Sequence, residues 1–334
     1  MTVRVGINGF GRIGRNFLRS VKTQDSDVDI VGINDITDNT TLAHLLRYDS
    51  VHRGFPGTVE VGDEGIVVDG DEIVITSERD PANLPWKDLG AEIVVESTGL
   101  FTQRDKAAAH LTAGARKVII SAPAKGQDAT IVLGANEDTY DPATHDVISM
   151  ASCTTGSVVP LAKVLDDTFG IANGLMTTVH AYTNDQGTHD APHKDLRRAR
   201  AAAISIVPTT TGAARAASLV LPQLEGKLDG MALRVPVVDG SVTDLVVNLE
   251  QEASVDEVND AYRAAADGPL AGVLEVSDDP IVSVDIIGNP HSCILDSLAT
   301  MATGSTVKVL GWYDNEWGYS CRLVDLVAFV GERL

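Results

Sequence analysis

The first 35 residues contain the pattern that most limits what this chain can fold into: a strand, a glycine-rich turn and a helix. Residues 3–7 (VRVGI) alternate β-branched residues with others, as a strand does. Gly9, Gly11 and Gly14 then form G-x-G-x-x-G ahead of a helical pattern over residues 16–21. In that context the first glycine permits a tight turn, the second lets a pyrophosphate approach the backbone, and the third lets helix and strand pack closely. The phosphates would rest on the helix N-terminus.

A second strand over residues 29–35 ends in Asp35, which lies 21 residues after Gly14. An acid at this distance holds the ribose hydroxyl pair of a dinucleotide. The order strand, glycines, helix, strand, acid therefore predicts a Rossmann-type domain. Three ordinary turn glycines and a surface aspartate are the weaker interpretation.

The pattern changes along the rest of the first half. Residues 57–80 indicate short antiparallel strands at a sheet edge. Apolar strands of the parallel type are expected over residues 93–99 and 117–123, with a helix over 104–113 between them. Both strands end in small polar residues, and such loops bind ligands in open α/β sheets.

Cys153 is the candidate nucleophile. It stands among small hydroxylated residues just before a helical pattern over residues 157–165. A helix N-terminus favours the thiolate, the nucleophilic form of cysteine. His180 follows 27 residues later at the end of a β-branched run, and a cysteine with a histidine is the minimum set for an activated thiol. On spacing alone, a buried structural cysteine and a core histidine stay open as alternatives.

The second half has longer alternating strands, over residues 232–237, 243–249 and 306–313. Ser254 and Glu257 form a capping box that opens a helix to about residue 266, and residues 323–330 indicate a closing helix. These patterns predict an α+β catalytic domain with a mostly antiparallel sheet. We expect residues 1–152 plus 315–334 to form the NAD-binding domain and residues 153–314 the catalytic domain.

Composition excludes several classes of function. The 334 residues carry a formal net charge of −21 with no basic run, so nucleic acid and anionic membranes are not expected as partners. No apolar run is long enough for a membrane span, and three cysteines without paired or metal-ligand spacing indicate a reducing, cytoplasmic compartment and no metal site. A solvated surface explains the acidic excess; the sharper hypothesis is a halophilic protein adapted to high salt.

Taken in order, these motifs resemble phosphorylating glyceraldehyde-3-phosphate dehydrogenase of the bacterial and eukaryotic type, over essentially the whole chain. The resemblance rests on residues 6–15 (GINGFGRIGR), 96–102 (ESTGLFT), 121–126 (SAPAKG), 151–155 (ASCTT), 180–186 (HAYTNDQ), 208–212 (PTTTG), 233–236 (LRVP) and 312–320 (WYDNEWGYS).

The resemblance implies site residues at the matching positions. Cys153 is then the nucleophile and His180 the base. Thr183 and Arg234 hold the phosphate of the substrate, and Ser152, Thr154, Thr211 and Gly212 hold inorganic phosphate. The remaining matches are cofactor contacts: Asn8, Gly9, Phe10, Gly11, Arg12, Ile13, Gly14, Asp35, Arg79, Ser97, Thr98, Ser121, Asn315 and Tyr319. In the family Asn315 orients the nicotinamide carboxamide. An Arg234 paired with a surface acid is the alternative for that residue.

The implied activity is the glycolytic and gluconeogenic oxidation of D-glyceraldehyde 3-phosphate to 1,3-bisphosphoglycerate with NAD. The thiol forms a hemithioacetal, hydride leaves for the cofactor, and phosphate displaces the resulting thioester. The resemblance also implies a homotetramer with the loop over residues 181–203 at an interface.

This sequence departs from the family pattern at three places. Met150 stands where the family has Asn, and Gly156-Ser157 stand where it has Asn-Cys. Ala191-Pro192 stands where NAD-specific members carry Leu-Pro. The smaller alanine leaves more room for a 2′-phosphate. Asp35 would repel that phosphate and no Lys or Arg follows it before Thr41, so NAD is favoured and NADP use stays open.

Two other functions fit parts of the sequence. An erythrose-4-phosphate dehydrogenase shares the scaffold and hydrolyses its acyl-enzyme, but the match at Thr211-Gly212 favours the phosphorylating enzyme. A catalytically inactive scaffold that binds partners is disfavoured by the presence of Cys153, His180 and Arg234.

Overall fold

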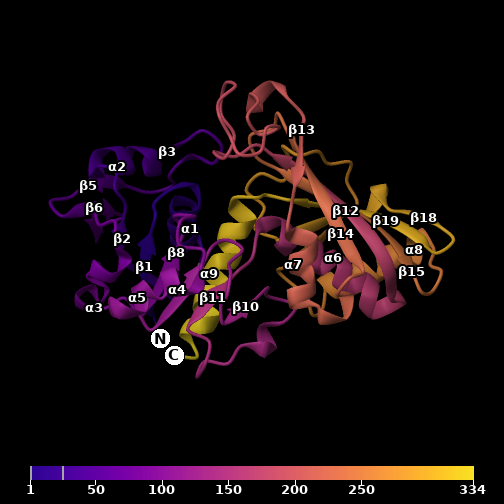
Figure 1. Cartoon of the computed structure of the whole chain (residues 1–334), viewed down its shortest axis with the longest axis horizontal. Coiled ribbons are helices and arrows are strands. Elements are labelled where there is room, and N and C mark those ends of the chain that lie inside the picture. Colours follow the sequence, from indigo (N-terminus) through magenta and orange to yellow (C-terminus); the bar gives the residue numbers. More distant parts are fainter. Residues whose placement is uncertain (1, 25) are drawn as a thin grey trace. The chain divides into compact units, whose positions relative to one another are not determined.

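The computed structural model describes residues 2–24 and 26–334, which form two compact units (Figure 1). Of the described residues, unit 1 contains 2–24, 26–131, 138–151 and 320–334, and unit 2 contains 132–137 and 152–319. Each unit is built around one large sheet.

The sheet of unit 1 has nine strands among the described residues, in the order β10-β11-β9-β8-β1-β2-β7-β6-β5. The pairs from β10 to β7 are all parallel, whereas β5, β6 and β7 pair antiparallel. The strands are β1 (Val3–Asn8), β2 (Val28–Asn34), β5 (Val59–Val61), β6 (Gly65–Val68), β7 (Asp71–Thr76), β8 (Ile93–Glu96), β9 (Lys117–Ile120), β10 (Ala129–Thr130) and β11 (Val147–Ser149), with β3 (Tyr48–Asp49) and β4 (Arg53–Gly54) as a separate pair.

Helices pack on this sheet through buried apolar side chains. They are α1 (Arg12–Thr23), α2 (Asn39–Arg47), α3 (Trp86–Leu89), α4 (Arg104–Ala107), α5 (Ala109–Thr112) and, beginning in unit 2, α9 (Trp317–Gly331). The Trp86 ring is fully buried against β1, and a Cβ added to Gly6 would lie 2.7 Å from it. Gly6 therefore makes room for the largest side chain of this core.

The sheet of unit 2 has eight strands, in the order β13-β14-β12-β15-β19-β17-β16, with β18 on β19. Most of its pairs are antiparallel, but β12 with β14 and β16 with β17 are parallel. The strands are β12 (Ile171–Ala181), β13 (Val207–Thr210), β14 (Leu228–Val235), β15 (Ser241–Leu249), β16 (Leu274–Ser277), β17 (Cys293–Asp296), β18 (Met301–Thr303) and β19 (Thr306–Tyr313).

The helices α6 (Cys153–Phe169), α7 (Ala213–Val220) and α8 (Val255–Ala266) contact the strands of this sheet and, in the case of α6, both other helices. Ser254 and Glu257 form the predicted capping box at the start of α8. Short 3₁₀ turns complete the described chain: Pro81–Asn83, Glu137–Thr139, Ala202–Ile204, Pro222–Leu224 and Ser297–Ala299.

The structure confirms the predicted fold class, a Rossmann-type α/β unit and an α+β unit with a mostly antiparallel sheet. It corrects two details. The helix expected over residues 104–113 is two four-residue helices, α4 and α5, that meet at Ala108. The helix expected from residue 157 begins four residues earlier, at Cys153, because Ser152 caps it. None of the described helices has the length and apolarity required to cross a bilayer.

Candidate active site

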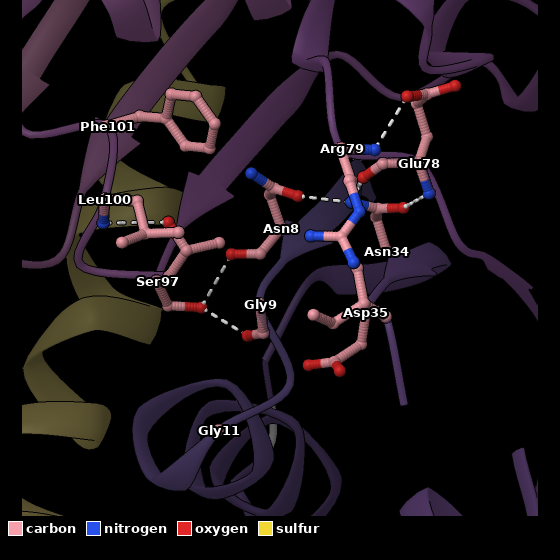
Figure 2. Close-up of a pocket in the computed structure, with 12 residues that line it drawn as sticks. Asn8, Gly9, Gly11, Asn34, Asp35, Glu78, Arg79, Ser97, Leu100 and Phe101 are labelled. Carbon is pink, nitrogen blue, oxygen red and sulfur yellow. Dashed lines mark hydrogen bonds between the residues drawn. The ribbon is translucent and has the colours of Figure 1, made fainter. Parts of the chain in front are cut away.

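Unit 1 contains a cavity of about 300 Å³ at the carboxyl ends of β1, β2 and β8 (Figure 2). Asn34, Asp35 and Arg79 lie on one side of it, and Ser97, Leu100 and Phe101 on the other. Of the predicted cofactor contacts, it brings together Asn8, Gly9, Gly11, Asp35, Arg79, Ser97 and Thr98. The carboxyl ends of parallel strands are where open α/β sheets bind ligands.

The glycine turn leaves room for an anion at the start of α1. A Cβ added to Gly11 would meet no atom within 4 Å, and no side chain caps this helix. The N–H groups of its first turn are thus available to a phosphate. Asp35 accepts hydrogen bonds from the Phe10 N–H at 2.8 Å and the Thr37 N–H at 2.9 Å, which fix its carboxylate at the cavity wall. These residues fit a dinucleotide such as NAD.

A buried polar network stabilises the glycine turn. Trp86 Nε1 donates to His110 Nδ1 at 3.0 Å, so His110 carries its proton on Nε2 and donates it to Glu96 Oε2 at 3.0 Å. Glu96 also accepts from Asn8 Nδ2 at 2.5 Å and from the N–H and hydroxyl of Thr98. The carboxylate therefore joins the end of β1 to the loop after β8.

The other predicted cofactor contacts of unit 1 have structural partners. Phe10 is fully buried, and Arg12 forms an ion pair with Asp49. Ile13 is in the first turn of α1, and a Cβ on Gly14 would lie 2.2 Å from the Gly9 carbonyl oxygen. The Ser121 hydroxyl donates to the Glu96 carbonyl at 3.1 Å, and Ser121 does not line the cavity.

In unit 2, Cys153 is the first residue of α6. The Ser152 hydroxyl accepts the Thr155 N–H at 3.1 Å and so caps the helix. Thr154 is buried and its hydroxyl bonds to the Tyr313 hydroxyl at 2.9 Å. The hydroxyls of Ser152 and Thr154 therefore hold the start of the helix around the sulfur.

His180 faces the thiol from the end of β12, with Nε2 3.5 Å from Cys153 Sγ. Its Nδ1 lies 2.7 Å from the Ala181 carbonyl oxygen and 2.7 Å from Arg234 Nη1. The carbonyl oxygen can only accept and the guanidinium can only donate, so these two contacts require opposite protonation states of Nδ1. In the tautomer that carries its proton on Nδ1, Nε2 has a lone pair and can take the thiol proton. Burial, with Arg234 adding to it, lowers the pKa of His180 to about 3, so the imidazole is neutral at pH 7.

The helix N-terminus favours the thiolate of Cys153, as the sequence indicates, but burial acts in the opposite direction. Burial raises the pKa of the Cys153 thiol to about 11, and Arg234 and two hydrogen bonds from Thr154 oppose this rise without cancelling it. Water reaches the partly exposed residue and lessens the effect of burial. The pair is thus a thiol beside an unprotonated imidazole.

Arg234, on β14, has no acidic partner among the described residues. Its Nη1 donates to the Ala181 carbonyl at 2.8 Å, and burial lowers the pKa of its guanidinium. Arg198 is a second cation that acts on Arg234 and lowers the same pKa. Arg198 is tied to Asp185 at 2.5 Å and to the Thr209 hydroxyl at 2.8 Å. Arg198 thus has acidic partners, whereas the guanidinium of Arg234 is open to an anionic ligand.

The remaining predicted residues of unit 2 lie in turns and at strand ends. Thr183 follows β12, and Gly212 precedes α7, where the Thr211 hydroxyl accepts the Ala213 N–H at 3.2 Å. Asn315 and Tyr319 are buried around the start of α9. No hydrogen bond among the described residues joins Thr183 or Gly212 to Cys153.

Comparisons with known proteins match both units. A family model described as the NAD binding domain of glyceraldehyde 3-phosphate dehydrogenase matches residues 3–104, and one described as the C-terminal domain matches residues 152–315. The chain belongs to the glyceraldehyde-3-phosphate dehydrogenase family.

Relatives in the family cover the chain from end to end. A glyceraldehyde-3-phosphate dehydrogenase of Mycobacterium tuberculosis is 62% identical over 340 residues, covering 100% of both chains. Glyceraldehyde-3-phosphate dehydrogenase 2 of Streptomyces avermitilis is 60% identical over 335 residues, again covering 100% of both chains. The enzyme of Geobacillus stearothermophilus is 59% identical and covers 100% of this chain and 99% of its own.

Two departures from the glyceraldehyde-3-phosphate dehydrogenase pattern have structural explanations. Met150 is buried in unit 1, and an apolar side chain there leaves no polar atom without a partner. Ser157 is also buried, and its hydroxyl bonds to the Thr243 hydroxyl at 3.0 Å and to Cys293 Sγ at 3.7 Å. The serine is thus part of the packing of α6 on the sheet.

Three residues that sequence reasoning gave no role contact this site in the glyceraldehyde-3-phosphate dehydrogenase fold. Tyr313 bonds to Thr154 and packs edge-on against His180, with ring centroids 5.9 Å apart. Arg198 lies near Arg234, and Ser241 bonds to Asn315 at 2.6 Å. Tyr313 belongs to the motif over residues 312–320 (WYDNEWGYS), whereas no local sequence motif contains Arg198 or Ser241.

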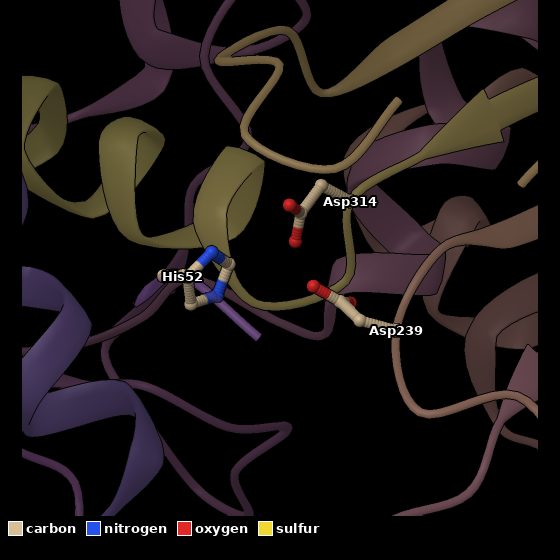
Figure 3. Close-up of side chains that lie close together, drawn as sticks. All are labelled: His52, Asp239 and Asp314. Atoms are coloured by element: carbon tan, nitrogen blue, oxygen red, sulfur yellow. The ribbon is translucent and has the colours of Figure 1, made fainter. Parts of the chain in front are cut away.

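Asp239 and Asp314 face each other in unit 2 (Figure 3). Both are buried. Burial, with the charges of Asp314 and Glu316 adding to it, raises the pKa of Asp239 to about 9. Asp239 is therefore protonated at pH 7 while Asp314 stays an acceptor for the N–H groups of Gly288, Glu316 and Trp317.

Proposed function

We propose that Cys153 and His180 carry the reaction of this family in this chain, the NAD-dependent oxidation of D-glyceraldehyde 3-phosphate to 1,3-bisphosphoglycerate with inorganic phosphate. The observation that supports it is the 3.5 Å contact between the Cys153 sulfur and the Nε2 atom of a neutral His180. A thiol next to an unprotonated imidazole is a nucleophile with its base in place.

In the first step the Cys153 sulfur bonds to the aldehyde carbon while its proton goes to His180 Nε2. That proton passes to the aldehyde oxygen and completes a hemithioacetal. In the free protein burial lowers the pKa of His180 to about 3 and raises that of the Cys153 thiol to about 11, so the proton stays on the sulfur until the sulfur bonds to the aldehyde carbon.

NAD, when bound, accepts the hydride from the hemithioacetal carbon. His180 takes the hydroxyl proton as the carbon–oxygen double bond forms, which leaves a thioester on Cys153. The turn around Gly11 holds the pyrophosphate, Asp35 the ribose hydroxyls, and Asn315 the carboxamide, as the family resemblance implies.

Inorganic phosphate then bonds to the thioester carbon as the bond from that carbon to the Cys153 sulfur breaks. The sulfur takes back the proton held by His180, and the acyl phosphate leaves. Two phosphate groups have to be bound in this reaction. Arg234 and Thr183 hold the phosphate of the substrate, and Ser152, Thr154, Thr211 and Gly212 surround the attacking phosphate. Arg198 also acts on Arg234 but is paired with Asp185 and Asp195, so Arg234 is the guanidinium of this region that has no acidic partner among the described residues.

We assign NAD binding to residues 1–152 plus 315–334 and catalysis to residues 153–314. The cavity around Asp35 and Gly11 supports the first assignment, and the contact between Cys153 and His180 supports the second.

We also propose a homotetramer in the cytoplasm of a cell with high internal salt. Leu196 in the loop over residues 181–203 is 81% exposed, and exposed apolar side chains support a subunit interface. The three cysteines are free thiols, which fits a reducing compartment. The net charge is −21, and the repulsion between the acidic side chains is weaker at molar salt. Light scattering and unfolding midpoints in dilute buffer and molar KCl test these points; a monomer, or equal midpoints, would contradict them.

The experiment for the reaction is NAD reduction with glyceraldehyde 3-phosphate, with and without inorganic phosphate, at low and molar KCl. Ser157→Ala serves as a control for a hydroxyl lost from the same helix, and Cys153→Ser as the inactive enzyme. We expect turnover that requires phosphate, prefers NAD to NADP and disappears only in Cys153→Ser. Turnover without phosphate would move the assignment to an enzyme that hydrolyses its thioester.

A further inference from the structure

Ser241 connects two parts of the candidate site that the sequence places far apart. It is the first residue of β15 and is 1% exposed. Its Oγ accepts the Ala181 N–H at 3.1 Å and lies 2.6 Å from Asn315 Oδ1. The backbone N–H can only donate, so the single hydroxyl proton of Ser241 is donated to the amide oxygen.

This hydrogen bond sets which way the Asn315 amide faces. The terminal torsion of asparagine has two broad, roughly equal orientations, so a neighbour has to choose between them. Ser241 selects the one in which Oδ1 faces β15. Nδ2 then faces away from Ser241 and makes no hydrogen bond with any residue in the described part of the chain.

The backbone of Asn315 is held separately. Asp314 accepts the N–H groups of Glu316 at 2.9 Å and Trp317 at 2.6 Å, and its other oxygen accepts the Gly288 N–H at 2.8 Å. These hydrogen bonds hold the backbone around Asn315, but they do not set the orientation of its side-chain amide. The amide orientation depends on Ser241.

The same residue also contacts the catalytic base. The Ala181 N–H donates to Ser241, whereas the Ala181 carbonyl oxygen lies 2.7 Å from His180 Nδ1 and accepts from Arg234 Nη1 at 2.8 Å. The two peptide groups that flank the Ala181 Cα therefore contact the imidazole on one side and, through Ser241, the Asn315 amide on the other.

We propose that Ser241 is a positioning residue that keeps the Asn315 Nδ2 as a hydrogen-bond donor toward the nicotinamide carboxamide oxygen. This rests on the proposed role of Asn315 as the residue that orients the carboxamide. Without the Ser241 hydroxyl the Asn315 amide also samples the flipped orientation. In that orientation Asn315 Oδ1 faces the carboxamide oxygen of the cofactor, so the hydrogen bond to the cofactor is lost.

The test compares binding of NAD with binding of ADP-ribose, which has the same adenosine and phosphates but no nicotinamide. Titration calorimetry on the cofactor-free protein measures both. We expect Ser241→Ala to weaken NAD binding about fivefold, equivalent to about 1 kcal/mol, and to leave ADP-ribose binding unchanged. Ser157→Ala is the matched control, because it removes another buried serine hydroxyl from unit 2 and should change neither.

Asn315→Ala makes the test a double-mutant cycle. It should weaken NAD binding on its own, and adding Ser241→Ala should cause no further loss. Equal losses for NAD and ADP-ribose, or an additive loss in the double variant, would refute the positioning role. NAD binding unchanged in Asn315→Ala would refute the role of Asn315 itself and the proposal with it. If Ser241→Ala fails to fold, Ser241→Cys keeps the size with a weaker donor and carries the same comparison.

Discussion

The second and third glycines of the glycine turn in unit 1, Gly11 and Gly14, can be compared by the same substitution. Gly14→Ala and Gly11→Ala add the same methyl group three residues apart. At Gly14 the new Cβ would lie 2.2 Å from the Gly9 carbonyl oxygen and 3.2 Å from the Ser97 hydroxyl, which itself donates to that carbonyl. At Gly11 it would meet nothing within 4 Å.

The two variants should therefore differ in stability. Real Cβ atoms essentially never lie under 3.0 Å from another atom, so the Gly9 peptide has to move in Gly14→Ala. Overpacking of this kind costs about 1–3 kcal/mol, offset by about 1 kcal/mol because alanine favours a helix more than glycine does. Because the clash at 2.2 Å is with a backbone atom, the overpacking cost should lie at about 2–3 kcal/mol, and we expect Gly14→Ala to lose about 1–2 kcal/mol in the free energy of unfolding. Gly11→Ala should stay within about 0.5 kcal/mol of the parent, as exposed substitutions do.

NAD binding should respond differently from stability. The open space above Gly11 is where the pyrophosphate approaches, so a methyl group there competes with it. We expect both variants to lose at least about tenfold in NAD affinity, equivalent to about 1.4 kcal/mol. Urea unfolding of the cofactor-free protein and calorimetry with NAD measure the two effects. A Gly11→Ala protein that binds NAD normally, or a Gly14→Ala protein of unchanged stability, would refute this account of the turn.

Three further predictions concern unit 2. His180→Asn should lower kcat by about 10²–10⁴-fold, the usual contribution of a general base, and unchanged turnover would exclude His180 from that role. Arg234→Lys keeps the charge but loses the planar fork, so KM for glyceraldehyde 3-phosphate should rise while far-UV circular dichroism stays the same; an unchanged KM would argue against phosphate binding. Asp239 holds a proton in the folded state up to about pH 9 but, unfolded, releases it near pH 4, so its burial lowers stability as pH rises through that window. Asp239→Asn should lose less stability than the parent between pH 5 and pH 8 in urea unfolding, and parallel losses would contradict the raised pKa.

Local patterns predicted the fold well because each depended on a few neighbouring residues. The strand over 306–313 and the capping box at Ser254 occur in the structure as the sequence indicated. The helix over 104–113 was wrong in detail, because Ala108 ends one short helix and begins another. Asp35 lines the cavity that its spacing from the glycines indicated.

The candidate site was only partly predictable. The helix N-terminus that favours the Cys153 thiolate can be predicted from sequence, whereas the burial that raises the pKa of the thiol cannot. Ser241 was missed because it reaches Asn315 and Ala181 only through the register of β15 between β12 and β19. Spacing along the chain contains no information about such contacts.

The serine that replaces the second family cysteine has a consequence for oxidation. A sulfenic acid at Cys153 can be rescued by a neighbouring thiol that closes a disulfide. One helical turn along α6, Ser157 presents a hydroxyl bonded to Thr243, which cannot do this. Cys293, beyond Ser157, is fully buried, and burial raises the pKa of its thiol to about 12, so it supplies no thiolate. Recovery of the oxidised protein therefore depends on small thiols from the surrounding solution. Inactivation by peroxide should increase as the concentration of these thiols in the cell falls.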